Sequence, residues 1–327
     1  MTEKLRAFRA HVKRLWPRYA LVPLIPFVAY ALLSAARSDL RVEHVGAIVL
    51  VAGLAYTGPR TKSLLAAIYP VGLVGLLYDG MRPLKNLGLS PERVLLCDLR
   101  ALELRLFGFE VNGFRMTLHD WFLVHHWPAV DLLAAFPYAT FILASLACAV
   151  FLAVRDPAAM KRFTWAFFAT NVAGFVTYHL LPAAPPWYFH THGCTVDLAT
   201  HASEGPALMR VDAMLGVSYF HGMYSKASSV FGALPSLHCA YPFLVVLEGW
   251  RSFGPRLRVL SVAYWLLMIF ASIYLDHHWL LDGILGSTYA LIASLVVRRL
   301  MPSRSDAAIP LDLPRQGPGR ASAMEAE

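Results

Sequence analysis

Residues 259–297 read VLSVAYWLLMIFASIYLDHHWLLDGILGSTYALIASLVV, two long apolar runs joined by a short polar stretch at Asp276-His277-His278. A helix needs about 20 mostly apolar residues to cross a bilayer. The runs at 259–275 and 279–297 are close to that length, so the sequence predicts two spanning helices connected by a polar turn.

The rest of the chain is also rich in apolar residues. Of its 327 residues 57% are hydrophobic and 15% charged, whereas soluble domains average about 45–50% and about 25%. The mean hydropathy of +0.51 argues against a disordered chain and against an ordinary soluble enzyme. We expect an all-α polytopic membrane bundle with about eight spans. The six further apolar runs lie at 19–36, 45–58, 63–79, 129–154, 163–182 and 233–249.

Three regions follow from the composition along the chain. Residues 1–18 form a basic N-terminal segment, 19–300 a membrane-embedded domain, and 301–327 a tail rich in Pro and Gly. The tail has no apolar periodicity, and we predict that it is disordered.

The basic residues indicate how the bundle is oriented. With eight spans, 19 of the 29 Lys and Arg residues fall on the segments that share a side with both termini. The positive-inside rule then places both termini in the cytoplasm. The net charge of +8 reflects this orientation, because no segment combines dense Lys and Arg with stacking aromatic residues as nucleic-acid binders do.

The run 21–33 and its following Ser34-Ala35-Ala36 also resemble a cleaved secretory signal, although a multispan protein usually keeps its first helix as an anchor.

A shorter amphipathic helix is expected between the third and fourth spans. Ser90-Pro91 has the pattern of a helix start, and Gly108 that of a helix end. An apolar face opposes a charged one, which predicts a helix lying in the membrane interface. The apolar face consists of Leu95, Leu96, Leu99, Leu102 and Leu106.

All histidines except His11 fall on or near the predicted outer face, where three polar motifs also meet, at 79–85, 232–238 and 274–282. In 232–238, Pro235 suits the first turn of a helix, so the free amides around Ser236 and His238 would face an anion.

The other two motifs add a nucleophile and a cation. In a helix, His278 and Asp282 are four residues apart and share a face, so the carboxylate can accept an imidazole N–H and leave the other ring nitrogen free to attack. In 79–85, the guanidinium of Arg82 can grip phosphate oxygens.

Each motif alone also fits a solvated residue at the membrane interface. An acid at the start of an apolar span is costly, however, and is by default functional. The ordered set of Pro-Ser-x-His followed some 40 residues later by His-x-x-x-Asp is the specific signal in this chain.

On these residues the chain resembles the type 2 phosphatidic acid phosphatase superfamily of membrane lipid phosphatases and phosphotransferases. Within it, the chain is most similar to the branch of fungal inositol phosphorylceramide synthases and their bacterial relatives, over about residues 60–300. The resemblance rests on Pro235-Ser236-Leu237-His238, on Tyr274 to Trp279 leading to Asp282, on Ala184-Pro185-Pro186-Trp187-Tyr188, and on His119-Asp120-Trp121.

The resemblance implies a six-helix phosphatase-type core, a phosphohistidine mechanism and no metal or other cofactor. His278 would be the nucleophile, Asp282 its orienting group and His238 the acid and base. The residues expected to bind substrate are Arg82, Lys85, Ser236, His277, Trp187 and Tyr188.

Two positions depart from the phosphatase pattern. Gly75 stands where phosphatases have a lysine, and Ser272 where they have an arginine. The loss of two phosphate-binding cations disfavours phosphomonoester hydrolysis and suits a less charged phosphodiester donor.

We therefore predict an inositol phosphorylceramide synthase-like phosphotransferase in a bacterial inner membrane, with its active site on the periplasmic side. Its partners would be the bilayer, phosphatidylinositol or a related phospholipid, and a ceramide-like acceptor. The alternatives are a lipid phosphate phosphatase and a non-catalytic lipid-binding or transport protein.

Several outer-face residues remain open. A zinc site at His190, His192, Cys194 and His201 matches no standard spacing. Cys97 and Cys194 are both expected outside, but the sequence does not decide whether they pair. Residues 184–188 fit either a headgroup site or a rigid prolyl turn, and 125–127 fit an aromatic belt.

Overall fold

The computed structural model describes residues 3–84, 87–227 and 229–302. The predicted substrate-binding residue Lys85 and the tail from residue 303 lie outside this part of the chain.

All eight predicted spans are helical in the described residues, which confirms the helical membrane bundle. The corresponding helices are α2 (Ile25–Ala36), α3 (Val42–Tyr56), α4 (Pro59–Met81), α7 (Pro128–Arg155), α8 (Pro157–Leu180), α12 (Leu237–Gly249), α13 (Pro255–Tyr274) and α14 (Leu280–Leu300).

Four helices of the described chain are long and apolar enough to cross a membrane: Pro59–Leu84, Pro128–Arg155, Pro255–Tyr274 and Leu280–Leu300. Helices α2, α3 and α12 are apolar but shorter. The outward faces are apolar too, since Leu143, Val150 and Val154 of α7 are 62%, 66% and 79% exposed. Such a surface is stable against lipid and not against water, which is consistent with an integral membrane protein.

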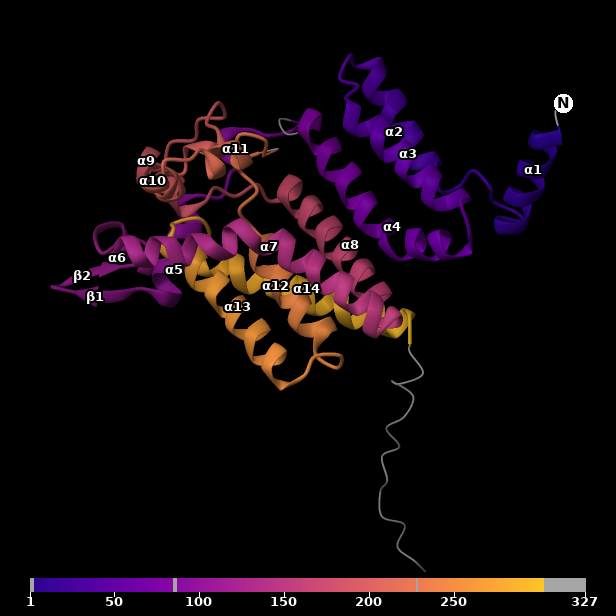
Figure 1. The fold of residues 1–327 in the computed structure, drawn as a ribbon. Coiled ribbons are helices and arrows are strands. Elements are labelled where there is room, and N and C mark those ends of the chain that lie inside the picture. The colour runs from indigo at the N-terminus through magenta and orange to yellow at the C-terminus, as the bar shows by residue number, and fades with distance from the viewer. Residues whose placement is uncertain (1–2, 85–86, 228, 303–327) are drawn as a thin grey trace, which may run out of the picture.

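The core of the bundle is built around α12. This helix packs against α7, α8, α13 and α14, and α4 covers the outer side of α8 (Figure 1). The six helices α4, α7, α8, α12, α13 and α14 thus form one contiguous unit. Helices α2 and α3 pair with each other and lean on α4, where Phe27, Val51, Ala55 and Leu65 form a small core.

Short elements gather at one end of the bundle, and only α1 (Glu3–Leu15) lies at the opposite side, beyond α4 (Figure 1). They are α5 (Cys97–Phe107), β1 (Phe109–Val111), β2 (Phe114–Met116), α6 (Leu118–Val124), α9 (Pro186–His192), α10 (Pro206–Leu215) and α11 (Tyr219–Tyr224). Single 3-10 turns cover Arg82–Leu84, Pro91–Arg93 and Ala202–Glu204.

The hairpin of β1 and β2 is a small addition to the expected all-α fold. Two local expectations need correction. The amphipathic helix begins at Cys97 and not at Pro91, because Pro91–Arg93 form a separate 3-10 turn. Helix α12 begins at Leu237, so Pro235 precedes the N-cap residue Ser236 and is not in the first helical turn.

The starts of α12 and α14 lie closer together than they could if residue 286 carried a side chain. The backbone N–H of Ser236 donates to the carbonyl oxygen of Asp282 at 2.9 Å. A Cβ on Gly286 would lie 2.0 Å from the carbonyl oxygen of Ser236. Glycine at 286 therefore sets the distance between the two helices.

We expect Gly286→Ala to destabilise the protein by at least about 2 kcal/mol or to prevent recovery of folded protein, because overpacking against backbone cannot be relieved by a rotamer change. Thermal unfolding in detergent measures the effect. Gly53→Ala is the matched control, since a Cβ there meets nothing within 4 Å. An unchanged unfolding midpoint for Gly286→Ala would contradict this packing.

Candidate active site

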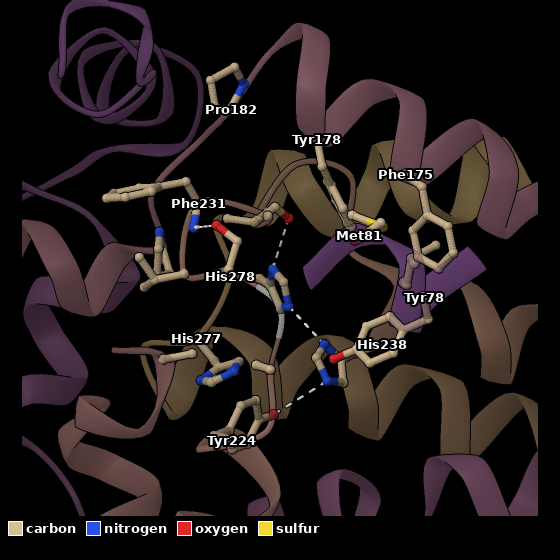
Figure 2. Close-up of a pocket in the computed structure, with 18 of the residues that line it drawn as sticks. Tyr78, Met81, Phe175, Tyr178, Pro182, Tyr224, Phe231, His238, His277 and His278 are labelled. Atoms are coloured by element: carbon tan, nitrogen blue, oxygen red, sulfur yellow. Dashed lines mark hydrogen bonds between the residues drawn. The ribbon is translucent and has the colours of Figure 1, made fainter. Parts of the chain in front are cut away.

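A cavity of about 530 Å³ opens where α4, α8 and α12 meet the turn between α13 and α14. His238, His277 and His278 lie on its wall, together with Tyr224, Phe231 and Met81 (Figure 2). Two of the three predicted motifs, 232–238 and 274–282, and the Arg82 end of the third therefore come together in space.

The two catalytic candidates from distant parts of the chain are in direct contact. His238 Nδ1 lies 2.9 Å from His278 Nε2, and these residues are 40 positions apart (Figure 2). His238 is held at the start of α12, while His278 sits in the turn before α14. A phosphoryl group entering the cavity would meet both rings at once.

The hydrogen bonds fix the tautomers of both rings. His278 Nδ1 lies 3.0 Å from the carbonyl oxygen of Ala233, which can only accept, so Nδ1 carries a proton. In the neutral ring, Nε2 of His278 is then unprotonated, and its lone pair accepts a hydrogen bond from His238 Nδ1–H. The other nitrogen of His238 accepts from the hydroxyl of Tyr224 at 3.3 Å. His278 thus presents an unprotonated nitrogen towards His238 and the cavity.

The carbonyl that orients His278 is itself fixed. Ala233 donates its N–H to the carbonyl oxygen of Ala183 at 3.1 Å, and Ala183 donates to Phe231 at 2.9 Å. Tyr178 adds a bond from its hydroxyl to the carbonyl oxygen of Pro235 at 2.9 Å. The loop before α12 is therefore rigid enough to act as the second wall of the His278 site.

Asp282 lies beside His278 but makes its shortest bond elsewhere. Its Oδ2 accepts from the backbone N–H of Trp279 at 3.0 Å and is 3.5 Å from His278 Nδ1. That second distance exceeds the usual hydrogen-bond range. Asp282 thus shapes the first turn of α14 beside the ring, while Ala233 makes the orienting bond.

Two cations line the cavity. Arg82 follows α4, its guanidinium Nη2 donates to the carbonyl oxygen of Lys226 at 3.1 Å, and its Nε lies 3.5 Å from Asp79 Oδ1. Lys226 comes from the loop after α11, and its exposed side chain also lines the cavity. Nothing in the sequence indicates Lys226, because it lies 144 positions from its partner Arg82.

The predicted substrate-binding residues divide into two groups. Arg82, His277 and Trp187 line the cavity, whereas Ser236 and Tyr188 are not among its described lining residues. The hydroxyl of Ser236 is buried and caps α12 by accepting from Cys239 N–H at 3.3 Å. That of Tyr188 is bonded to the backbone of Asp197. Both side chains stabilise the walls of the site.

The remaining lining is mainly apolar and aromatic. Tyr224 packs on the ring of His277 at a centroid distance of 4.8 Å, and Tyr138, which is not a lining residue, packs on the same ring at 5.0 Å. Such walls suit lipid chains and keep water away from the two histidines. The sequence missed Tyr224, because nothing near it in the chain marks a tyrosine as a partner of His238.

The outer-face residues left open by the sequence now have definite partners. Cys97 and Cys194 form a disulfide that joins the start of α5 to the loop after α9. His190 contacts two carboxylates, Asp120 and Asp276. Within the described chain no group of three or more His, Cys, Asp and Glu side chains is placed to hold a metal ion.

A family comparison covers this part of the chain. The sequence profile of the PAP2 superfamily matches residues 106–296, which include His238, His278 and Asp282. The chain belongs to the PAP2 superfamily, and it is an enzyme of that superfamily embedded in a membrane.

Three curated relatives show which members of the superfamily this chain is similar to. The chain is 32% identical over 280 residues to a phosphoinositol dihydroceramide synthase of Bacteroides thetaiotaomicron, covering 84% of this chain and 90% of the relative. It is 32% identical over 196 residues to an inositol phosphorylceramide synthase of Candida albicans, covering 59% of this chain and 40% of the relative. It is 30% identical over 197 residues to the catalytic subunit of the Saccharomyces cerevisiae inositol phosphorylceramide synthase, covering 59% of this chain and 47% of the relative. No solved structure was found to match.

We expect His278→Ala to lower kcat by at least about 1,000-fold, as loss of an essential nucleophile does. Asp282→Ala also abolishes turnover, because it removes the carboxyl group 3.5 Å from His278 Nδ1 and its bond to Trp279. His277→Ala has a milder effect, since that side chain lines the cavity without a hydrogen bond to His238 or His278. Steady-state rates in detergent measure all three, with the exposed His126→Ala as control. Full activity in His278→Ala or Asp282→Ala would overturn the assignment.

Proposed function

We propose that this enzyme transfers an inositol phosphate group from phosphatidylinositol to the primary hydroxyl of a ceramide-type lipid and releases diacylglycerol. The observation that carries the proposal is the pair His238 and His278, 2.9 Å apart on the wall of a mainly apolar cavity that also holds Arg82. The relatives, a phosphoinositol dihydroceramide synthase and an inositol phosphorylceramide synthase, suggest the headgroup and the acceptor class.

In the first step His278 Nε2 attacks the phosphorus of the donor. The new N–P bond forms as the bond from phosphorus to the glyceride oxygen breaks, and protonated His238 gives its proton to that oxygen. The negative charge of a bound phosphodiester stabilises the protonated form of His238. The products are diacylglycerol and phosphoinositol bound to His278.

In the second step the acceptor hydroxyl enters where the glyceride left. His238, now neutral, takes the hydroxyl proton while the acceptor oxygen attacks phosphorus and the N–P bond breaks. The electron pair returns to His278 Nε2. Each histidine ends in its starting state, so the cycle needs no redox cofactor.

The charges around the cavity favour a phosphodiester donor over a phosphomonoester. A phosphodiester carries one negative charge and a monoester close to two at neutral pH. The two cations of the phosphatase pattern are replaced by Gly75 and Ser272, which leaves Arg82 and Lys226 as the cations of the described cavity lining. We propose that these two hold the donor phosphate and inositol at the cavity entrance.

We expect Lys226→Met to raise KM for phosphatidylinositol about 10-fold with little change in kcat, because a contact to a charged group contributes on the order of 1.5 kcal/mol. Lys4→Met, on the exposed face of α1, is the matched control. Initial rates at varied donor concentration in mixed micelles give both constants. An unchanged KM would remove Lys226 from the donor site.

The disulfide supports an orientation for the site. Disulfides persist in oxidising compartments such as the periplasm, and Cys97–Cys194 lies among the short elements at the cavity end of the bundle. We propose that this end faces the periplasm of a bacterial inner membrane and that both termini are cytoplasmic. The asymmetry of Lys and Arg along the chain gives the same orientation.

The function is tested with purified protein in detergent, supplied with phosphatidylinositol and a fluorescent ceramide or dihydroceramide. A parallel reaction contains labelled phosphatidate and no acceptor. Wild type and His278→Ala are compared by thin-layer chromatography and mass spectrometry. We expect an inositol phosphorylceramide product and diacylglycerol from the wild type alone.

The two reactions separate the alternatives. Phosphate release from phosphatidate without any transfer would make the chain a lipid phosphate phosphatase. Inactivity in both reactions, with folded protein, would contradict the proposed donor and acceptor.

A further inference from the structure

A second group of titratable side chains lies next to the cavity without lining it. It consists of Arg100, Asp120, His190, Asp276 and His119, which come from α5, α6, α9 and the turn after α13. Charged groups this well buried are rare unless they are paired. The reaction described above uses none of them, so the group needs an explanation of its own.

His190 is held between two carboxylates. Its Nδ1 lies 2.7 Å from Asp276 Oδ2 and its Nε2 lies 3.0 Å from Asp120 Oδ1. Ionised carboxylate oxygens only accept hydrogen bonds, so both ring nitrogens must donate. The geometry therefore requires an imidazolium at His190.

The surroundings stabilise that charge. Burial lowers the pKa of His190, but the bonds to Asp120 and Asp276 outweigh it and raise the pKa to about 9. On the far side, Arg100 grips Asp120 with two bonds of 3.0 and 3.2 Å. Positive and negative groups thus alternate from α5 to the turn.

The inner end of this series is the turn that carries His278. Asp276 has φ of +58°, a conformation that residues with a side chain rarely adopt. Its carbonyl oxygen accepts from Trp187 N–H of α9 at 3.0 Å. Directly after it, the N–H groups of His277 and His278 both donate to the carbonyl oxygen of Ser272, at 2.9 and 3.1 Å.

The remaining oxygen of Asp276 faces another buried ring. His119 Nδ1 lies 3.2 Å from Asp276 Oδ1, and its Nε2 lies 3.9 Å from Glu103 Oε1. Glu103 in turn accepts from the N–H of Leu280 at 3.0 Å, at the first residue of α14. The turn is therefore held by carboxylates at both of its ends.

We propose that His190 is a positioning residue: as an imidazolium bridging Asp120 and Asp276, it locks the turn that presents His278 and fastens α9 over the cavity. The inference rests on the proposed role of His278 as nucleophile. Loss of the proton would remove one of the two bonds that His190 donates and would weaken the connection between the turn and α9, where the bond from Trp187 N–H to the Asp276 carbonyl oxygen would remain.

The sign of the pH effect follows from the raised pKa. An unfolded histidine has a pKa of about 6.5. The bridge therefore contributes its full stability below that value and loses it as the pH rises through about 9. The charged and titratable groups that face His190 and its partners are Arg100 and Glu103 of α5, His119 and Asp120 of α6, and Asp276 of the turn.

The first test is kinetic. His190→Gln keeps a polar side chain but cannot carry the charge, and we expect kcat to fall at least about 10-fold at pH 7 with KM for phosphatidylinositol changed less than about 3-fold. The exposed His201→Gln is the control on the same outer loop. Unchanged kcat, or a loss confined to KM, would overturn a role in positioning His278.

The second test does not depend on catalysis. In the His278→Ala background, the thermal midpoint is measured in detergent from pH 6 to 10. We expect it to fall from about pH 6.5 and to level off above about pH 9. In Asp120→Asn, which removes one carboxylate, the fall should be smaller and should end at a lower pH. The same pH dependence with and without Asp120→Asn would contradict the bridge even if the proposed transfer reaction is correct.

Discussion

The close approach of α12 and α14 is the constraint on which the site depends. The carbonyl oxygen of Ser236 occupies the space that a Cβ on residue 286 would need, so this residue must be glycine. The N–H of Ser236 also donates to the carbonyl oxygen of Asp282. With the two helix starts fixed in this way, His238 and His278 meet at 2.9 Å, although each is carried by a different element. An α-helix cannot bring these residues together by itself, because they are 40 positions apart. The chemistry therefore follows from backbone packing.

Around this contact the protein controls charge in two layers. Inside the cavity, the hydrogen bond from Tyr224 to His238 and the one from His278 to Ala233 fix which nitrogen of each ring carries no proton. Outside it, the alternating charges of Arg100, Asp120 and His190 hold the turn without entering the cavity. In the proposed reaction the donor phosphate brings a negative charge to the reacting nitrogens. Its negative charge then assists the proton transfer by His238, because the low-dielectric walls strengthen the attraction.

Much of this arrangement was predictable from the sequence. Apolar runs of spanning length located all eight helices, and the spaced motifs ending at His238 and Asp282 identified the family that the comparisons confirm. The errors are local: the start of α12 was misplaced because Pro235 fits both a first helical turn and the residue before a cap. The sequence does not indicate Lys226, and it suggests His190 only as a member of a zinc pattern without standard spacing, because the partners of both residues lie far along the chain. The roles given to the individual site residues remain predictions.

A covalent intermediate on His278 is the central claim, and rapid-quench trapping tests it most directly. Wild-type protein is mixed with phosphatidylinositol carrying a radiolabelled phosphate, without acceptor, and quenched in alkali, where phosphohistidine is preserved. The account predicts acid-labile label and the mass of one phosphoinositol group on the peptide that contains His278, and neither in His278→Ala. Normal product formation when acceptor is added, with no label on His278 at any quench time, would contradict it and indicate direct transfer between the lipids.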